Sequence, residues 1–142
     1  MTMPAKTLFT ANVHTVGGRE GWAKSSDGQL DVKLSIPGSN RPGTNPEQLF
    51  AAGWSACFEG ALAHAAREQG VRLRPKTAVD AEVDLGLDEV DGYFLRARLN
   101  VSIPGIAEDV AQRLVDRAHA TCPYSKMTRN GIEARVALAV AA

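Results

Sequence analysis

Apolar and polar residues alternate along several stretches of this chain, and the two clearest stretches predict a β-hairpin. Residues 78–87 and 93–103 carry an apolar side chain at every second position. A period of two is typical of a half-buried strand, because successive side chains point to opposite faces of a sheet. Residues 88–92 are rich in turn-forming types and are expected to join the two strands.

Three further strands are expected elsewhere. Residues 30–36 alternate in the same way, and an earlier strand is expected within 6–16. The glycine-containing segment 17–28 is interpreted as the connection between these two strands. Residues 132–140 follow an asparagine-glycine turn, alternate again, and are expected to close the sheet.

A long helix is predicted over 44–69. Thr44 and Glu47 have the spacing of a capping box, and Asn45 is a good N-cap candidate in its own right. Gly70 is a suitable C-terminal stop. Most residues between these ends are small and apolar, which is typical of a helix buried at the centre of a domain.

A second helix is predicted over 107–121. Its first turn carries Glu108 and Asp109, and its last turn carries His119, a distribution that suits the helix dipole. The helix is expected to end at Cys122, because Pro123 cannot continue it.

The predicted order is therefore β-β-α-β-β-α-β. Hairpins interrupted by helices favour a mostly antiparallel sheet around a long central helix, which is the α+β class. The chain has 142 residues, the size of one domain, so we expect a single domain over 1–142.

Composition excludes several classes of function. Sixteen Lys and Arg residues balance sixteen Asp and Glu residues, with no basic stretch of the kind that binds nucleic acid or anionic membranes. The first residues do not have the pattern of a signal peptide, and no apolar run is long enough to span a bilayer. We therefore expect a cytoplasmic protein, in which a lasting structural disulfide is rare.

The two cysteines, Cys57 and Cys122, are 65 positions apart and leave several interpretations open. A free cysteine often packs as a small hydrophobic residue, and Cys57 lies in an alanine-rich helix. Two cysteines and three histidines, without paired ligand spacing, do not favour a closed zinc site, which needs four ligands. Redox chemistry is the remaining possibility.

Redox chemistry at Cys57 requires a positive charge from elsewhere in the protein. A thiol with a pKa of about 8.5 is only a few per cent thiolate at pH 7. Cys57 is predicted in the middle of a helix, where neither end of the dipole helps. Cys122, at the carbonyl end of the second predicted helix, is expected to stay the more neutral of the two.

Three segments together resemble the organic hydroperoxide resistance proteins of the Ohr/OsmC family. They are Gly-Gly-Arg-Glu-Gly at 17–21, the segment 44–62 beginning Thr-Asn-Pro-Glu-Gln-Leu, and Cys-Pro-Tyr-Ser-Lys-Met-Thr-Arg at 122–129. The Cys-Pro-Tyr-Ser sequence favours the Ohr branch over the OsmC branch. The resemblance spans nearly the whole chain.

The resemblance implies a thiol peroxidase in which Cys57 is the peroxidatic nucleophile. It implies that Cys122 resolves the sulfenic acid of Cys57 into an intramolecular disulfide, and that Arg19 and Glu47 complete the site. It further implies that no cofactor is bound, that dihydrolipoyl dithiols are the reductant, and that organic hydroperoxides, including those of fatty acids, are the substrates.

The resemblance also implies an intertwined homodimer, which bears on where the site is assembled. Glu47 and Cys57 are ten residues apart, about 15 Å along a straight helix. Either the helix breaks, near Gly53 for example, or a second chain contributes. We favour Arg19 and Glu47 of one chain meeting Cys57 of the other.

An apolar lining is expected to select the substrate. Its candidates, each of which could equally belong to an ordinary core, are Phe9, Phe50, Phe58, Phe94, Met127 and Ile132. Trp54 stands where relatives often carry tyrosine. Two alternatives remain open: an OsmC-like peroxidase of broader substrate range, and a redox-sensing or ligand-binding module that does not turn over.

Overall fold

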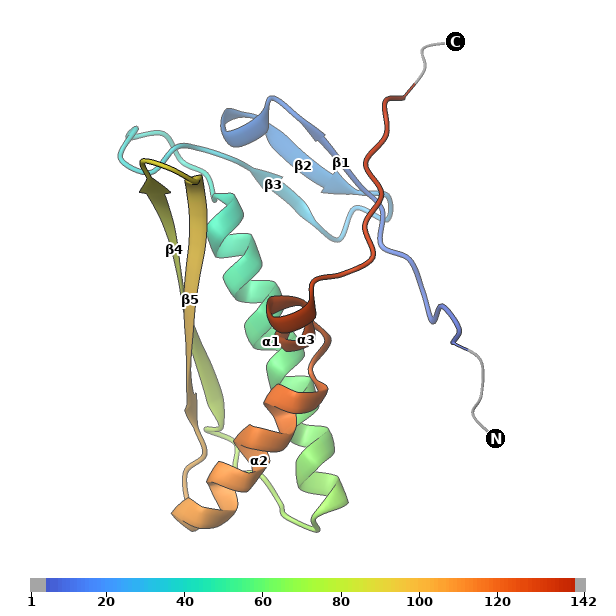
Figure 1. The fold of residues 1–142 in the computed structure, drawn as a ribbon, viewed down its shortest axis with the longest axis vertical. Coiled ribbons are helices and arrows are strands. Elements are labelled where there is room, and N and C mark those ends of the chain that lie inside the picture. Colours follow the sequence, from blue (N-terminus) through green and yellow to red (C-terminus); the bar gives the residue numbers. More distant parts are fainter. Residues whose placement is uncertain (1–4, 140–142) are drawn as a thin grey trace. The chain divides into compact units, whose positions relative to one another are not determined.

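The protein is described by a computed structural model over residues 5–139, which divide into two compact units (Figure 1). The first unit runs to Leu49, and the second begins at Phe50. The two units are described separately below.

The first unit contains a three-stranded antiparallel sheet in the order β1-β2-β3. The strands are β1 (Val13–Val16), β2 (Trp22–Ser25) and β3 (Asp31–Lys33), and a short 3-10 helix η1 (Gly18–Glu20) lies between the first two. The sheet leads into a loop that returns to it through a parallel bridge between Leu34 and Thr44.

This sheet corrects three predictions. The strand expected within 6–16 is confined to β1, and the strand expected over 30–36 is confined to β3. The segment 17–28 is not merely a connection, because it contains β2. Only one of the four β2 residues, Ala23, is buried, so this strand carries almost no alternation by which it could be recognised.

The long helix α1 (Pro46–Glu68) begins at the end of the first unit and continues without a break into the second. Its N-cap is Asn45, whose side-chain oxygen accepts the Gln48 backbone N–H at 2.8 Å. The predicted capping box does not form, because the Thr44 hydroxyl donates to the Gln48 side chain instead. At the other end Gly70 has a φ of +67°, and Val71 donates to the Ala66 carbonyl, so the predicted stop is confirmed.

The second unit packs helices against one face of a hairpin (Figure 1). The hairpin strands are β4 (Ala78–Asp88) and β5 (Gly92–Ser102), and the predicted turn between them is confirmed. The Asp88 carboxylate accepts the backbone N–H groups of Val90 and Asp91 and so fixes that turn. Buried residues of α1 and of α2 (Glu108–Thr121) form the core, with inward side chains of the hairpin packed against them.

The described residues bury only one face of α1. The buried side chains are Trp54, Phe58, Leu62, Ala65 and Ala66. The opposite face carries the small residues Ala52, Ala56 and Gly60, which are exposed. The apolar composition of α1 predicted burial on most sides of the helix, but the described residues cover only one side.

The chain continues in helical structure after α2. Cys122 is extended, with φ −62° and ψ 124°, and a third helix, α3 (Pro123–Asn130), follows at once. Pro123 ends α2 as predicted, but it also occupies the first position of a new helix, where a proline is well tolerated. The sequence analysis did not anticipate α3.

The closing strand predicted over 132–140 is wrong for the part that the structure describes. Residues 132–139 form no strand, and residue 140 lies outside the described range. Val136 and Leu138 are 99% and 90% exposed. An alternating segment becomes a strand only where a sheet edge is available for pairing, and within residues 5–139 this segment pairs with none.

No helix within residues 5–139 combines the length and the apolar character that crossing a membrane requires.

Candidate active site

Arg19 and Glu47 form a two-point ion pair in the first unit. Arg19 Nη1 donates to Glu47 Oε1 at 2.8 Å, and Nη2 donates to Oε2 at 3.0 Å. The two parallel bonds fix the plane of the guanidinium as well as its position. The sequence predicted that these residues act together, and the structure brings them into contact.

Glycines give the Arg19 segment its tight path. Gly17 and Gly18 have φ angles of +81° and +56°, in the left-handed region that other residues adopt at a cost. A Cβ at Gly21 would overlap the Val16 carbonyl oxygen. The glycines of the Gly-Gly-Arg-Glu-Gly motif therefore serve the turn from β1 into η1, which presents Arg19.

A second ion pair braces the same segment. Arg41, in the loop after β3, donates through Nη2 to Glu20 Oε1 at 2.8 Å. Both side chains are more than half exposed, at 59% and 54%. This pair ties the loop to the residue next to Arg19, but it is solvated and is therefore weak.

The two cysteines lie together in the second unit. Both are free thiols; Cys57 is half-buried on α1, and Cys122 is fully buried between α2 and α3. The Cys122 thiol is hydrogen-bonded to that of Cys57. Residues 65 positions apart are thus placed so that their sulfur atoms face each other.

Burial is the main influence on Cys57, and it raises the pKa of its thiol. The hydrogen bond to Cys122 raises this pKa further, whereas the backbone N–H of Tyr124 lowers it. Cys57 lies in the middle of its own helix, as predicted, so this help comes from a backbone N–H in the first turn of another helix, α3. The help is insufficient, because the net shift is still toward the neutral thiol.

Aromatic side chains pack in the same core cluster as the two cysteines, and the sequence did not predict the contacts of Trp54 and Tyr124. Phe50 stacks on Trp54 and on Tyr124, with ring centroids 5.6 and 6.2 Å apart. The indole N–H of Trp54 donates to the buried hydroxyl of Ser125 at 3.1 Å. The signal for Trp54 was its helical spacing from Phe50 and Cys57, which places all three on neighbouring positions of α1.

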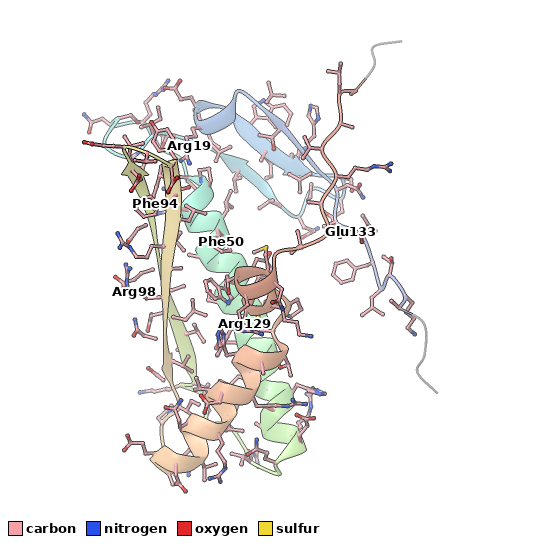
Figure 2. The ribbon with its side chains drawn as sticks, in the orientation of Figure 1. Arg19, Phe50, Phe94, Arg98, Arg129 and Glu133 are labelled. Carbon is pink, nitrogen blue, oxygen red and sulfur yellow. The ribbon has the colours of Figure 1, made fainter. Side chains whose placement is uncertain are left out.

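Two of the predicted lining residues face a common pocket. Phe50 and Met127 line a pocket of about 460 Å³ between α1, β5 and α3. Phe58, by contrast, is a core residue that is 3% exposed. Figure 2 shows Phe50 on the upper part of α1.

The other three candidates are not among the residues that line this pocket. Phe94 shares the outer face of the hairpin with Arg98 (Figure 2), and its ring covers Gly86. The alternation of β5 already implied that placement, because Leu95 faces inward. Phe9 and Ile132 are 84% and 64% exposed.

The corner between α2 and α3 is held by Arg129. Its Nη1 donates to the His119 carbonyl at 2.9 Å, and its Nη2 reaches the Ala120 carbonyl at 3.4 Å. The same Nη1 lies 3.2 Å from the His119 ring nitrogen Nε2. These carbonyls end α2, so the guanidinium occupies the favourable position for a cation beside the segment that carries Cys122.

Among residues 5–139, no three His, Cys, Asp or Glu side chains converge as ligands. The second unit offers the chemistry of two adjacent thiols, and the first unit offers an arginine oriented by a carboxylate.

Comparisons with known proteins agree with this geometry. Residues 28–137 match the model of the family described as OsmC-like protein. The chain is 44% identical over 144 residues to an organic hydroperoxide resistance protein of Xanthomonas axonopodis pv. citri, covering 98% of this chain and 100% of that protein. It is also 44% identical to organic hydroperoxide resistance protein OhrB of Bacillus subtilis, over 92% of this chain and 98% of that protein.

The fold agrees as well. The crystal structure of B. subtilis OhrB superposes with a TM-score of 0.81 at 44% identity, covering 87% of this chain and 93% of that chain.

Proposed function

Because this chain belongs to the organic hydroperoxide resistance branch of the OsmC-like family, we propose that it is a thiol peroxidase that reduces organic hydroperoxides, including those of fatty acids, in defence against oxidative stress. The observation that carries the proposal is the hydrogen-bonded pair of thiols, Cys57 and Cys122, contributed by separate helical segments. Two thiols in contact with each other can form a disulfide with little movement.

The reaction has three steps. The Cys57 thiolate attacks the outer oxygen of the hydroperoxide, the O–O bond breaks, and the departing alkoxide takes a proton to become an alcohol. Cys57 is left as a sulfenic acid. The Cys122 sulfur then attacks the Cys57 sulfur, a disulfide forms, and water leaves. A dihydrolipoyl dithiol reduces this disulfide and is itself oxidised to the cyclic disulfide.

The first step requires a positive charge near Cys57. Burial raises the pKa of this thiol, and the Tyr124 N–H does not offset that effect. A guanidinium oriented by a carboxylate favours the thiolate over the thiol and can also hydrogen-bond the peroxide. Arg19, held by Glu47, is the group that we assign to this role.

We assign Arg19 and Glu47 of one copy to Cys57 of a second copy. Glu47 and Cys57 lie on one continuous helix, so the expected alternative of a break near Gly53 does not apply. Ten residues of α1 separate them by about 15 Å. The site is then complete only in a homodimer.

Exposed apolar surface supports such a homodimer. Residues 132–139 alternate like a strand, yet pair with no described strand and expose Val136 almost completely. The small residues on the uncovered face of α1 would allow another helix to approach closely. An exposed strand-like segment and an uncovered helix face are both surfaces that a second copy can bury.

The cytoplasm suits this chemistry. Two thiols that must return to the reduced form after every turnover need a compartment that supplies reductant, and disulfides in the cytosol are usually transient and catalytic. We therefore propose a cytoplasmic enzyme that binds no cofactor and uses a dihydrolipoyl group, free or on a lipoylated protein, as its reducing partner.

The test is the intact mass of the reduced protein after one equivalent of cumene hydroperoxide. The wild-type protein is expected to lose about two daltons as the disulfide forms. Cys57→Ser is expected not to react, and Cys122→Ser is expected to hold a sulfenic acid that dimedone traps. A wild-type protein that keeps its mass would refute the proposal.

Steady-state turnover separates the remaining alternatives. Sustained consumption of cumene hydroperoxide with dihydrolipoamide, and slower consumption of hydrogen peroxide, is the expected result. Equal rates would indicate an OsmC-like peroxidase of broader range. A single oxidation without turnover would indicate a redox-sensing or ligand-binding module.

A further inference from the structure

A buried hydrogen bond joins the helix that carries Cys57 to the segment that follows Cys122. The Trp54 indole N–H, on α1, donates to the Ser125 hydroxyl, in the first turn of α3, at 3.1 Å. Ser125 is fully buried, and Trp54 is 8% exposed. Among the described residues, this is the one hydrogen bond that links a side chain of α1 to a side chain of α3.

This hydrogen bond lies next to the contacts of the two thiols. Cys57 follows Trp54 by three residues on α1, and residues three apart are neighbours on a helix surface. The Cys57 thiol contacts the Cys122 thiol and the Tyr124 backbone N–H. Ser125 directly follows Tyr124 in the chain. The bond is therefore placed where it can fix the start of α3 relative to Cys57.

The other contacts at this junction constrain the position of α3 on α1 less strictly. Phe50 stacks on Tyr124 with ring centroids 6.2 Å apart, but apolar burial is non-directional. Arg129 binds carbonyls of α2, so it fixes α3 to α2 and not to α1. A hydrogen bond weakens steeply as donor and acceptor lose alignment. Loss of this one would also leave the buried Ser125 hydroxyl unpaired, which is costly.

We propose that the Trp54–Ser125 hydrogen bond positions the resolving cysteine, by holding the start of α3 on α1 so that Cys122 stays within reach of Cys57. This inference rests on the proposed peroxidase function. In the resolving step the Cys122 sulfur attacks the sulfenic sulfur of Cys57, an S–S bond forms and water leaves. Because that bond is short, about 2.05 Å, the step depends on how often the two sulfur atoms meet. Trp54 and Ser125 are positioning residues, since they act through the α1–α3 junction.

The test is the equilibrium between dithiol and disulfide in glutathione buffers, which needs no peroxide. Glutathione disulfide oxidises the two thiols and two glutathione molecules are released, so the equilibrium constant reports the effective concentration of one thiol at the other. Trp54→Phe and Ser125→Ala are each expected to lower this constant at least about threefold, as for the loss of one hydrogen bond. The double variant is expected to show the same fall and not the product of the two, because both substitutions remove the same bond.

Leu62→Ala is the matched control for lost stability. Leu62 is a fully buried residue of α1, so its truncation leaves a cavity in the core but keeps the hydrogen bond. Its equilibrium constant is expected to equal that of the wild-type protein. An equal fall in Leu62→Ala would overturn the inference, and so would independent effects of the two substitutions in the double variant.

Hydrogen exchange of the indole N–H groups checks the bond itself. The chain contains two tryptophans, and the second, Trp22, is 43% exposed. By NMR, the Trp54 indole N–H is expected to exchange at least about threefold faster in Ser125→Ala than in the wild-type protein. Equal exchange in the two proteins would overturn the inference. This measurement decides the question if Trp54→Phe does not fold.

Reaction with peroxide separates this inference from the proposed function. With one equivalent of cumene hydroperoxide, Ser125→Ala is expected to form the sulfenic acid at the wild-type rate and the disulfide at least about threefold more slowly. An unchanged rate of disulfide formation would refute the positioning role in an active enzyme. A protein that consumes no hydroperoxide, but shows the shared fall in glutathione buffers, would refute the proposed function and leave the positioning of the thiols standing.

Discussion

At the scale of single residues, the charge balance at Cys57 is decided by groups far from it in the sequence. Burial favours the neutral thiol, and the first turn of α3 offers one opposing N–H. The peroxidase reaction needs the thiolate, so most of the stabilisation must come from a full positive charge. Arg19 can provide that charge in a defined orientation, because both of its terminal nitrogens are bonded to Glu47.

Replacement of Arg19 by Gln should therefore move the ionisation of Cys57 to higher pH. Removing a nearby positive charge disfavours the thiolate, which raises the pKa of the thiol, by at least about one unit. The rate of alkylation of Cys57 by iodoacetamide, measured against pH in Cys122→Ser protein, reports this pKa.

Two further variants make this measurement specific. Arg41→Gln removes an arginine that pairs with Glu20 beside the same segment, and its profile should match that of the parent protein. Arg19→Lys keeps the charge but not the two-point geometry, so an intermediate profile is expected. A profile unchanged by Arg19→Gln would show that this arginine does not act on Cys57.

At the scale of secondary-structure elements, the α2–α3 corner positions Cys122, the cysteine to which we assign the resolving role. Cys122 is the one extended residue between the two helices, and Arg129 binds the last carbonyls of α2 from α3. The guanidinium thus holds the corner closed around a residue whose side chain must meet Cys57. We assign Arg129 the role of positioning Cys122, because its guanidinium binds His119 and Ala120 and neither thiol.

Arg129→Gln should slow disulfide formation without slowing the first oxidation. A looser corner presents Cys122 less often, so the sulfenic acid of Cys57 lives longer and more of it is oxidised irreversibly by excess peroxide. Intact mass after a peroxide titration measures the overoxidised fraction, which is expected to increase several-fold. Arg113→Gln, which loses only an exposed pair with Asp109 on α2, should behave as wild type. Equal overoxidation in the two variants would contradict the role of Arg129.

Close packing between α1 and α3 gives a second test at this scale. A Cβ at Gly53 would lie 2.8 Å from the Tyr124 hydroxyl oxygen, nearer than ordinary contact allows. Gly53→Ala should therefore be destabilising, by about 1 to 3 kcal/mol, although alanine is the better helix former. Tyr124→Phe removes the nearest clashing atom, so the same substitution should cost less in that background. Urea unfolding of the four proteins measures the coupling, and a coupling of zero would exclude the contact.

At the scale of the whole molecule, the chain leaves surfaces that its own described residues do not cover. They are the segment 132–139 and the small-residue face of α1. The same second copy that would cover them would also bring the Arg19–Glu47 pair to Cys57. In this proposal the protein is active only as a dimer.

Mixing two inactive variants should restore activity. Cys57→Ser keeps the Arg19–Glu47 pair, and Arg19→Gln keeps Cys57, so each mixed dimer has one complete site if the two halves come from different chains. When the variants are refolded together, about one quarter of the wild-type activity is expected, because half of the dimers are mixed and each has one of two sites. A mixture no more active than its components would place Arg19 and Cys57 of the same chain in one site.

The parts of the fold that could be predicted are those that one sequence pattern specifies locally. The alternation in β4 and β5 yielded the hairpin and its turn, because a period of two already divides the inner from the outer face. The bounds of α1 followed from Asn45 and Gly70, whose side chain and backbone angles act within one helical turn. The pairing of Arg19 with Glu47 was expected from the family resemblance, because both residues stand in segments that carry it.

What the tertiary structure decided depends on contacts between distant segments. The strand β2 has too little alternation to be recognised, and it exists because β1 and β3 pair with both of its edges. The segment 132–139 has the alternation without an edge to pair with, so the pattern alone was misleading. The sequence by itself contains the two thiols, the arginine and the glutamate to which the family resemblance assigns the proposed chemistry. Only the folded chain placed Cys122 and the start of α3 against Cys57, because burial and contact are properties of the packed chain and not of any local stretch of it.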